Sequence, residues 1–356
     1  MDILIKDLNK FYQSKQALHD IHMTLPAGSF TAIVGPSGCG KTTLMRCLAG
    51  FLQADQGTIH FGEKDVTDVS PQKRETAMVF QNYALWPHMS VFDNIAYGLK
   101  LKKLLKAQIE EKVMRMLEKV EIDTADVKKR FPTQYSGGQQ QRIALARALV
   151  LEPALLLMDE PLSNLDAKVR QRLRVEIRKL QKELGITAVY VTHDQEEALS
   201  MADQVIIMNQ GRIEQMGRPE ELYRQPKSYF VAHFLGNSNT LTVSSRDGQY
   251  WIGNQPLPML PASGAGKTSR LVVRGEDARI SFQAEQPVQS QMQVKGVLRE
   301  SLFLGAGYRH WVEVEDQSLF IDTENPLEGK GACYVSLSAE TCYLFEEETL
   351  GEGRAS

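Results

Sequence analysis

The stretch that decides the fold lies near the amino terminus and reads Val34-Gly35-Pro36-Ser37-Gly38-Cys39-Gly40-Lys41-Thr42-Thr43. It fits the pattern Gly-x4-Gly-Lys-[Ser/Thr] of a phosphate-binding loop. The apolar run Phe30–Val34 precedes it and is typical of a buried strand, and residues 44–50 follow with helical spacing and a glycine stop. Strand, loop and helix in this order are the context in which the pattern binds phosphate, whereas a chance glycine-rich turn would lack these flanks.

The residue types of the loop explain the expected chemistry. The glycines allow backbone torsions that other side chains block, so the chain can curl around a phosphate. The loop amides and the positive end of the following helix would face the anion. Lys41 would reach the terminal phosphates, and the Thr42 hydroxyl would ligate magnesium. The predicted contact set is Gly35, Pro36, Ser37, Gly38, Cys39, Gly40, Lys41, Thr42 and Thr43.

Length and charge limit the classes of protein to consider. The chain has 356 residues, enough for two or three domains with ample core. Its net charge is -3, but from Thr240 onward 10 Lys/Arg stand against 16 Asp/Glu, or -6, which leaves +3 for the first 239 residues. Neither part is basic enough to indicate nucleic-acid binding from electrostatics alone.

Targeting signals and cysteines add two expectations. No uninterrupted apolar stretch approaches the roughly 20 residues of a membrane helix, and the first residues lack the shape of a secretory signal. The cysteines Cys39, Cys47, Cys333 and Cys342 show no zinc-ligand spacing. We therefore expect a protein of the reducing cytoplasm that meets a membrane only from its side and through partners.

Apolar runs alternate with helical patterns through the first 235 residues, which predicts an α/β domain with a largely parallel sheet. The expected strands are 3–5, 18–25, 30–34, 57–62, 76–80, 154–158 and 187–191, and the expected helices lie within 91–150 and 167–184. The second of these helices is rich in Arg and Lys, which we interpret as a solvated face. Gln81, Asp159 and His193 each follow a strand, at the edge where open α/β sheets bind ligands.

The pattern of the sequence changes at about residues 234–240, from alternating apolar runs and helical patterns to short strand-like runs. Short strand-like runs separated by turn residues follow at 250–252, 270–273, 294–298, 308–314 and 333–337, and they predict a small all-β, barrel-like domain. Residues 263–268 resemble a second phosphate loop, but Pro261 stands where the pattern requires its first glycine. We expect no strand before that segment and a strand after it, so we interpret it as a plain loop.

The pair Asp159-Glu160 follows a run of apolar residues and carries the strongest chemical signal outside the phosphate loop. A first carboxylate can hold magnesium through water, and a second can polarise the attacking water. Taken alone, the pair could be an acidic turn. A single His193 is more often structural than catalytic, and a single Gln81 usually has no special role.

In combination and in order, these residues resemble the ATPase subunit of the ATP-binding cassette (ABC) transporter family. The motifs match over residues 1–235, and Ser136-Gly137-Gly138-Gln139-Gln140 resembles the family's signature motif. Tyr135 stands where the family usually has leucine. The resemblance implies a P-loop ABC ATPase domain over 1–235, with a helical subdomain at about 86–152, and it implies ATP and Mg2+ as ligands.

The resemblance also implies roles for single residues. Tyr12 would stack on adenine; as an isolated tyrosine it would more often be a packing residue. Gln81 would sense the metal and the attacking water. Glu160 would be the catalytic base, Asp159 would stand behind the metal, and His193 would contact the γ-phosphate. The implied metal-binding set is Thr42, Gln81 and Asp159.

The family works as a head-to-tail dimer. Residues 163–166 resemble the loop that communicates across that dimer. Ser136, Gly138 and Gln139 of one subunit would close over the ATP held by the other.

A narrower resemblance concerns residues 79–95, which look like the subgroup serving bacterial importers of sugars, glycerol phosphate, polyamines, phosphonates and ferric iron. Those subunits carry a C-terminal transport-associated oligonucleotide-binding-like (TOBE) domain, implied here at 240–350. Val273-Arg274-Gly275-Glu276-Asp277 resembles its Val-Arg-Pro-Glu-Asp stretch, with Gly275 in place of proline. This domain is not expected to bind nucleic acid; it would support dimerisation or bind a regulator.

The implied assembly is a homodimer with two transmembrane permease subunits at the cytoplasmic face of a bacterial inner membrane, and indirectly a solute-binding protein. Residues 82–97 would receive a permease helix. The alternative is a soluble ABC ATPase of DNA repair or translation, which usually has two cassettes or a long coiled-coil insertion. A small-molecule kinase built on the same loop would not need the signature motif. The transported solute cannot be read from this subunit.

Overall fold

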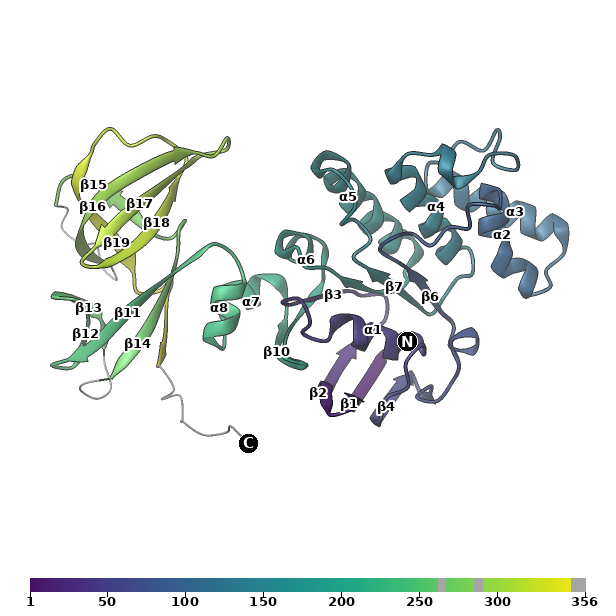
Figure 1. Ribbon diagram of the computed structural model, residues 1–356, viewed down its shortest axis with the longest axis horizontal. Helices are drawn as coiled ribbons and strands as arrows, with labels where there is room; N and C mark the ends of the chain where they lie inside the picture. Colours follow the sequence, from purple (N-terminus) through teal and green to yellow (C-terminus); the bar gives the residue numbers. More distant parts are fainter. Residues whose placement is uncertain (262–266, 285–290, 347–356) are drawn as a thin grey trace. The chain divides into compact units, whose positions relative to one another are not determined.

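The structure is a computed structural model that describes residues 1–261, 267–284 and 291–346. The chain divides into two compact units, Met1–Leu222 and Tyr223–Ser356 (Figure 1). Helix α7, Pro219–Arg224, spans the division. This division lies upstream of residues 234–240, where the sequence pattern changes.

Unit 1 contains two sheets. The mixed sheet has the order β10-β9-β3-β8-β7-β6, in which the neighbours from β9 to β6 run parallel and β10 is antiparallel. The antiparallel sheet has the order β2-β1-β4-β5. The strands are β1 Ile3–Tyr12, β2 Lys15–Leu25, β3 Phe30–Val34, β4 Gln56–Phe61, β5 Lys64–Asp65, β6 Thr76–Val79, β7 Leu155–Asp159, β8 Thr187–Val191, β9 Gln204–Asn209 and β10 Arg212–Gly217. The predicted α/β domain with a largely parallel sheet is confirmed.

The helices of unit 1 are α1 Lys41–Ala49, α2 Val91–Leu101, α3 Lys106–Lys119, α4 Gly137–Leu149, α5 Ala167–Leu184 and α6 Gln195–Met201, with short 3-10 turns at Pro71–Lys73 and Pro132–Gln134. Local signals set their ends. The Ser136 side chain caps α4, and the Asp166 side chain caps α5 by accepting from the Val169 amide. Gly185 ends α5 in the left-handed conformation that favours glycine.

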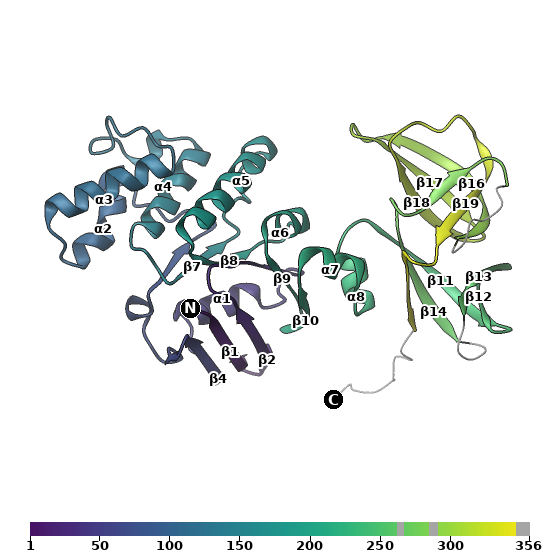
Figure 2. The same ribbon diagram turned by 180° about the vertical axis from the view of Figure 1, so that it is seen from behind.

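The central strands are buried on both faces, as parallel strands between two layers must be. Leu155, Leu157 and Val189 join a core with α1 and the antiparallel sheet. Leu156 and Tyr190 face the opposite way and join a core with α2, α3, α4 and α5. Figures 1 and 2 show α1 on one side of the mixed sheet and α5 on the other. The continuous apolar runs of the sequence follow from this double burial.

One expectation for unit 1 is wrong. The basic face of α5 is not simply solvated, because Arg174 is only 9% exposed and its guanidinium bonds acidic side chains at the start of α6. A sequence pattern cannot distinguish such a face from a solvated one, because the partners are supplied by a different helix.

In its described residues unit 2 is all-β apart from its first helices, and the two sheets found there have the orders β13-β12-β11-β14-β20 and β15-β19-β16-β17-β18. Its elements are α8 Tyr229–Phe234, β11 Ser238–Arg246, β12 Gln249–Ile252, β13 Gln255–Pro261, β14 Thr268–Arg274, β15 Arg279–Ser281, β16 Gln291–Phe303, β17 Tyr308–Val314, β18 Gln317–Thr323, β19 Gly331–Ser338 and β20 Cys342–Glu346. Side chains from both sheets form one core. The predicted all-β, barrel-like domain is confirmed.

The segment that mimics a phosphate loop needs one correction. A strand, β13, does precede it, although the sequence predicted none. Its prolines obscured it, and prolines are tolerated because β13 lies at the edge of its sheet. Strand β14 follows at Thr268 as expected, and residues 262–266 lie outside the described residues.

Candidate active site

The loop after β3 is shaped by close backbone approaches. Gly40 has φ +106°, and a Cβ there would lie 2.8 Å from the Ala17 carbonyl oxygen. A Cβ at Gly35 would lie 2.1 Å from the Met208 carbonyl oxygen. These positions accept only glycine, because a side chain would collide with backbone of neighbouring strands. The loop therefore curls tightly into the first turn of α1, where backbone amides are free to meet an anion.

Lys41 begins α1 and is 7% exposed. Its ammonium donates to the carbonyl oxygens of Gly35 at 2.7 Å and Pro36 at 3.0 Å. The lysine side chain thus folds back over the loop, and its ammonium lies on the inner side of the curve that the loop backbone makes. A cation held there is placed to neutralise a phosphate bound by the same loop.

The loop forms one wall of a pocket of about 680 Å3. The other walls are the hairpin between β1 and β2 and the turn between β9 and β10. The His19 amide of β2 donates to the Gly211 carbonyl at 2.8 Å and ties the hairpin to that turn, and the Gly211 amide donates to the Cys39 carbonyl at 3.0 Å and ties the turn to the phosphate-binding loop. The lining residues are Tyr12, Lys15, Gln16, Ala17, His19, Ser37, Gly38, Gly40, Lys41, Thr42, Thr43, Glu160, Gln210, Gly211 and Arg212.

Glu160 reaches this pocket from the end of β7. Its backbone has φ +44°, the left-handed conformation that a non-glycine residue rarely adopts. His193 approaches it from the end of β8, and the Nδ1 atom lies 3.2 Å from Glu160 Oε2. The imidazole is exposed, whereas Glu160 is mostly covered. Neighbouring strands thus bring an acid and an imidazole together, as their positions after strands predicted.

Asp159 ends β7 and lies half-buried directly before Glu160. Burial, and then the like charge of Glu160, raise the pKa of the Asp159 carboxyl, while Arg46 and Lys41 oppose this shift. A carboxylate in these surroundings would be stabilised by an added cation. Among the described residues, no group of three or more His, Cys, Asp or Glu side chains could hold a metal by itself.

Gln81 follows β6, the strand beside β7, but it is not among the described residues that line the pocket. It is exposed, and its carbonyl accepts a bond of 3.0 Å from the Asn164 side chain. Ser136, Gly138 and Gln139 also lie outside the described lining. They begin α4, where a Cβ at Gly138 would lie 3.0 Å from Val169 Cγ1 of α5. The structure therefore groups Tyr12, the loop and Glu160, and leaves the signature residues apart.

Several lining residues were missed by sequence reasoning. Lys15 and His19 line the pocket from β2, and Arg212 lines it from the start of β10. No motif marks them, because their position depends on contacts between segments far apart in the chain, such as the bond from the His19 amide to the Gly211 carbonyl. The only signal was a pair of turn-forming dipeptides, Gln13-Ser14 and Gln210-Gly211.

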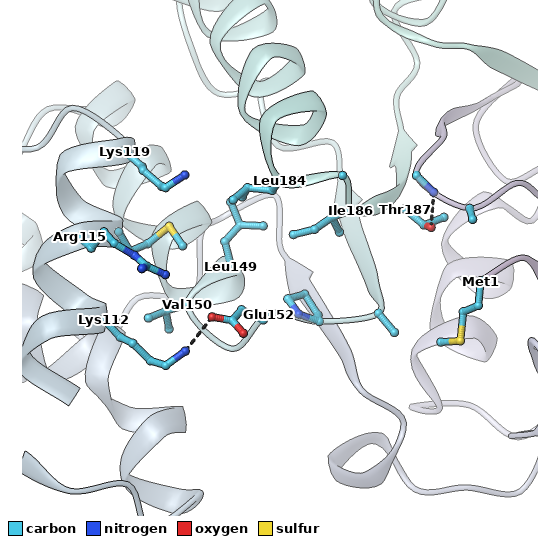
Figure 3. Close-up of a pocket in the computed structure, with 16 residues that line it drawn as sticks. Met1, Lys112, Arg115, Lys119, Leu149, Val150, Glu152, Leu184, Ile186 and Thr187 are labelled. Atoms are coloured by element: carbon cyan, nitrogen blue, oxygen red, sulfur yellow. Dashed lines mark hydrogen bonds and ion pairs between the residues drawn. The ribbon is translucent and has the colours of Figure 1, made fainter. Parts of the chain in front are cut away.

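A larger cleft of about 880 Å3 lies at the opposite edge of the sheet, where β7 and β8 begin. Figure 3 shows Lys112, Arg115 and Lys119 along one wall, facing Leu184 and Ile186. Lys112 pairs with Glu152 at 2.7 Å, and Lys119 pairs with Glu183. We assign the active site to the smaller pocket, because it holds the phosphate-binding loop and lies at the carboxyl ends of the strands.

Fold and pocket together define a P-loop ATPase. Residues 18–163 match the family described as ABC transporter. The sulfate/thiosulfate import ATP-binding protein CysA of Bacillus cereus is 52% identical over 261 residues, which are 72% of this chain and 72% of that protein. This chain therefore belongs to the ABC transporter family, and it is an ATP-binding subunit with ATPase activity.

Two further comparisons agree. The spermidine/putrescine import ATP-binding protein PotA of Thermobifida fusca is 43% identical over 340 residues, covering 91% of this chain and 86% of that protein. The dimeric structure of MJ0796, a bacterial ABC transporter cassette, matches with a TM-score of 0.55 and 28% identity, covering 61% of this chain and 98% of that one. No helix in the described part of the chain has both the length and the apolar character needed to cross a membrane.

Proposed function

We propose that this chain is the ATP-hydrolysing subunit of an ABC importer, with its ATPase domain at 1–235 and a TOBE-like domain at 240–350. The observation that carries the proposal is the pocket lined by the phosphate-binding loop and Glu160, with His193 in contact with Glu160 from outside the described lining. Relatives named as import ATP-binding proteins support the importer class over a soluble ABC ATPase. These relatives serve an anion and a polycation, so likeness in this subunit does not identify the solute.

In this proposal ATP lies in the pocket with its phosphates on the loop formed by Gly35 to Thr43. Lys41 would exchange its bonds to loop carbonyls for bonds to the terminal phosphates. Tyr12, 45% exposed at the end of β1, offers a ring face on which adenine would stack. Lys15 and Arg212 would add positive charge beside the phosphates.

Thr42 in the pocket lining, together with Asp159 and Gln81 at the ends of the neighbouring strands β7 and β6, offers the oxygen ligands that suit Mg2+ as a partner of ATP. The Thr42 hydroxyl, the Asp159 carboxylate and the Gln81 amide would supply oxygen ligands, and the phosphates would supply the others, which is how proteins usually hold this ion. Asp159 in particular has the raised pKa of a carboxyl that a nearby cation would relieve. When bound, the ion would neutralise charge on the β- and γ-phosphates.

Hydrolysis would begin when a Glu160 carboxylate oxygen accepts a proton from the attacking water. The left-handed backbone of Glu160 points its side chain into the pocket, which supports this role. His193 would stabilise that carboxylate through Nδ1 and reach the γ-phosphate with its other ring nitrogen. Gln81 would orient the water from the end of β6.

The functional unit would be a head-to-tail homodimer at the cytoplasmic face of the membrane. Ser136 and Gln139 are exposed at the start of α4 and cap each other there. With Gly138 they would close over the ATP of the second copy, where the amides of the helix terminus meet phosphate. A dimeric cassette among the similar structures supports this arrangement. The domain after residue 240 would support the dimer.

The surface after Gln81 would receive the permease subunits. The rings of Trp86 and Tyr97 lie 4.7 Å apart, and the Arg147 guanidinium lies 4.9 Å from the Trp86 ring. Burial lowers the pKa of Arg147. Leu85 and Phe92 instead pack against the core of unit 1, so they support the surface from below. Tyr97 is exposed, whereas Trp86 and Arg147 are half-buried, and a partly exposed aromatic pair beside a cation suits a partner helix.

Affinity purification of this chain from its native membranes in mild detergent tests the importer class. Two multi-span permease proteins in stoichiometric amount are the expected companions, and a solute-binding protein would join when solute is added. Ribosomal or DNA-repair proteins in their place would contradict an importer and would favour the soluble class of ABC ATPases.

A further inference from the structure

The three residues Thr192, His193 and Asp194 form the turn after β8, and both neighbours of His193 are anchored in one buried cluster. The Thr192 hydroxyl donates to Glu197 Oε2 at 2.8 Å. Asp194 accepts a bond of 2.9 Å from Arg174. The imidazole between them is exposed, and its Nδ1 atom contacts Glu160 Oε2 at 3.2 Å. Its position therefore depends on these two anchors.

Glu197 is the centre of this cluster. It belongs to α6 and is 3% exposed. Tyr190 donates its hydroxyl to Glu197 Oε2 at 2.7 Å, and Arg174 lies 3.5 Å from Glu197 Oε1. Burial and the adjacent Glu197 raise the pKa of Tyr190 far above its usual value, so the hydroxyl stays a donor. A buried carboxylate needs such partners, because an unpaired charge in the interior is costly.

Arg170 connects this cluster to the opposite side of the active site. Its Nη1 lies 3.6 Å from Asp194 and its Nε lies 3.9 Å from Glu197. Its Nη2 donates to the Leu165 carbonyl at 3.0 Å. Leu165 belongs to the loop after Glu160, and Ser163 of the same loop bonds the Glu160 carbonyl at 3.0 Å. One guanidinium thus spans the turn that carries His193 and the loop that follows Glu160.

We propose that Arg170 and Glu197 are positioning residues for ATP hydrolysis, which hold the His193 turn against the Glu160 loop. This rests on the roles proposed above for Glu160 and His193. Neither positioning residue lines the pocket in the described structure, so each acts through His193 and not on ATP. The planar guanidinium is suited to this task, because it donates a hydrogen bond to the Leu165 carbonyl on one side and forms ion pairs with Asp194 and Glu197 on the other, whereas a lysine would satisfy one side only.

A double-mutant cycle on the purified full chain tests the proposal, with kcat and the Kd for ATP as readouts. Arg170→Met should lower kcat at least about tenfold and change the Kd less than about twofold, since positioning is lost but binding is not. In a His193→Ala background, Arg170→Met should cost nothing further. Arg172→Met is the matched control, because this exposed arginine of the same helix pairs only with Glu176 among the described interactions.

The outcomes distinguish a failure of the positioning role of Arg170 from a failure of the proposed role of His193. If Arg170→Met leaves kcat unchanged, the positioning role is overturned. The same holds if the double variant lowers kcat by the product of the two single factors, because the two residues would then act independently. If His193→Ala itself keeps full turnover, the proposed role of His193 fails, and this inference fails with it. If Arg170→Met does not fold, Tyr190→Phe is the alternative test variant. It removes a single hydroxyl that donates to Glu197, and it should also lower kcat.

Discussion

Replacing Gly40 by alanine is the sharpest perturbation of the phosphate-binding loop. Gly40 precedes α1 with φ +106° and ψ -3°. The added methyl carbon would lie 2.8 Å from the Ala17 carbonyl oxygen and 3.1 Å from Leu18 Cδ2. The first neighbour is backbone of β2 and cannot rotate away, so the loop of the variant must shift. The backbone amides of the loop, which would contact the nucleotide, would shift with it.

The expected loss follows from the backbone strain. A non-glycine residue held in such a conformation costs about 1–3 kcal/mol. In the free variant the loop relaxes, and ATP binding must restore the strained geometry. Since each 1.4 kcal/mol is about tenfold, the Kd for ATP should rise about 5- to 150-fold. The close contact with Ala17 places the expected value in the upper half of that range.

Two matched glycine positions separate the effect of backbone strain from that of the collision, and an effect on ATP binding from one on stability. Gly38 has φ +79° and no described atom within 4 Å of an added Cβ, so Gly38→Ala reports backbone strain without collision. Gly185 has φ +62° with similar free space, but it ends α5 outside the pocket. Gly185→Ala should lower the unfolding free energy and leave the Kd unchanged. Equilibrium titration with a fluorescent ATP analogue measures all three, and a Gly40→Ala protein that binds as tightly as wild type would refute the reasoning.

Three further predictions concern stability. Arg74→Met should lower the unfolding free energy of unit 1 by about 3 kcal/mol or more in urea, because the buried guanidinium donates to four backbone carbonyls; an unchanged midpoint would contradict this. Asn239→Ala should cost unit 2 about 2 kcal/mol, measured as a lower urea midpoint, since the amide makes bonds of 2.8 and 2.7 Å to the Phe320 backbone. Burial raises the pKa of Cys47 from 9.0 to about 11, so its neutral thiol stabilises the fold below pH 9 and this contribution is lost between pH 9 and 11. Relative to Cys47→Ala, wild type should therefore lose about 2–3 kcal/mol across that window, and a constant difference would speak against it.

Much of the active site could be predicted because its residues are fixed by local sequence. The glycines of the loop report backbone geometry directly, and the side chains after β7 and β8 meet because parallel strands end at one edge. The positions of Glu160 and His193 directly after apolar runs therefore predict that both side chains lie at this edge. The parts that depend on contacts between distant segments, such as Lys15 and Arg212, left no local pattern beyond the turn-forming dipeptides beside them.

The helix α5 shows why patterns of charge are ambiguous. Arg170, Arg172 and Arg174 look alike in sequence, but only the second points mainly to solvent. Their difference arises from α6, whose acidic residues pack against one side of α5. Strand β13 was missed for a related reason, since its prolines are excluded from a central strand but accepted at an edge. Tertiary context decided both cases.

The central claim is that Glu160 is the base for ATP hydrolysis in a pocket closed by a second copy of the chain. The most direct measurement is the molar mass of Glu160→Gln by light scattering with Mg-ATP, together with its turnover. We predict a stable ATP-dependent dimer and a turnover at least about 100-fold below wild type, whereas Glu118→Gln, an exposed change on α3, should behave as wild type. A Glu160→Gln protein that stays monomeric with ATP, or that keeps wild-type turnover, would contradict the account.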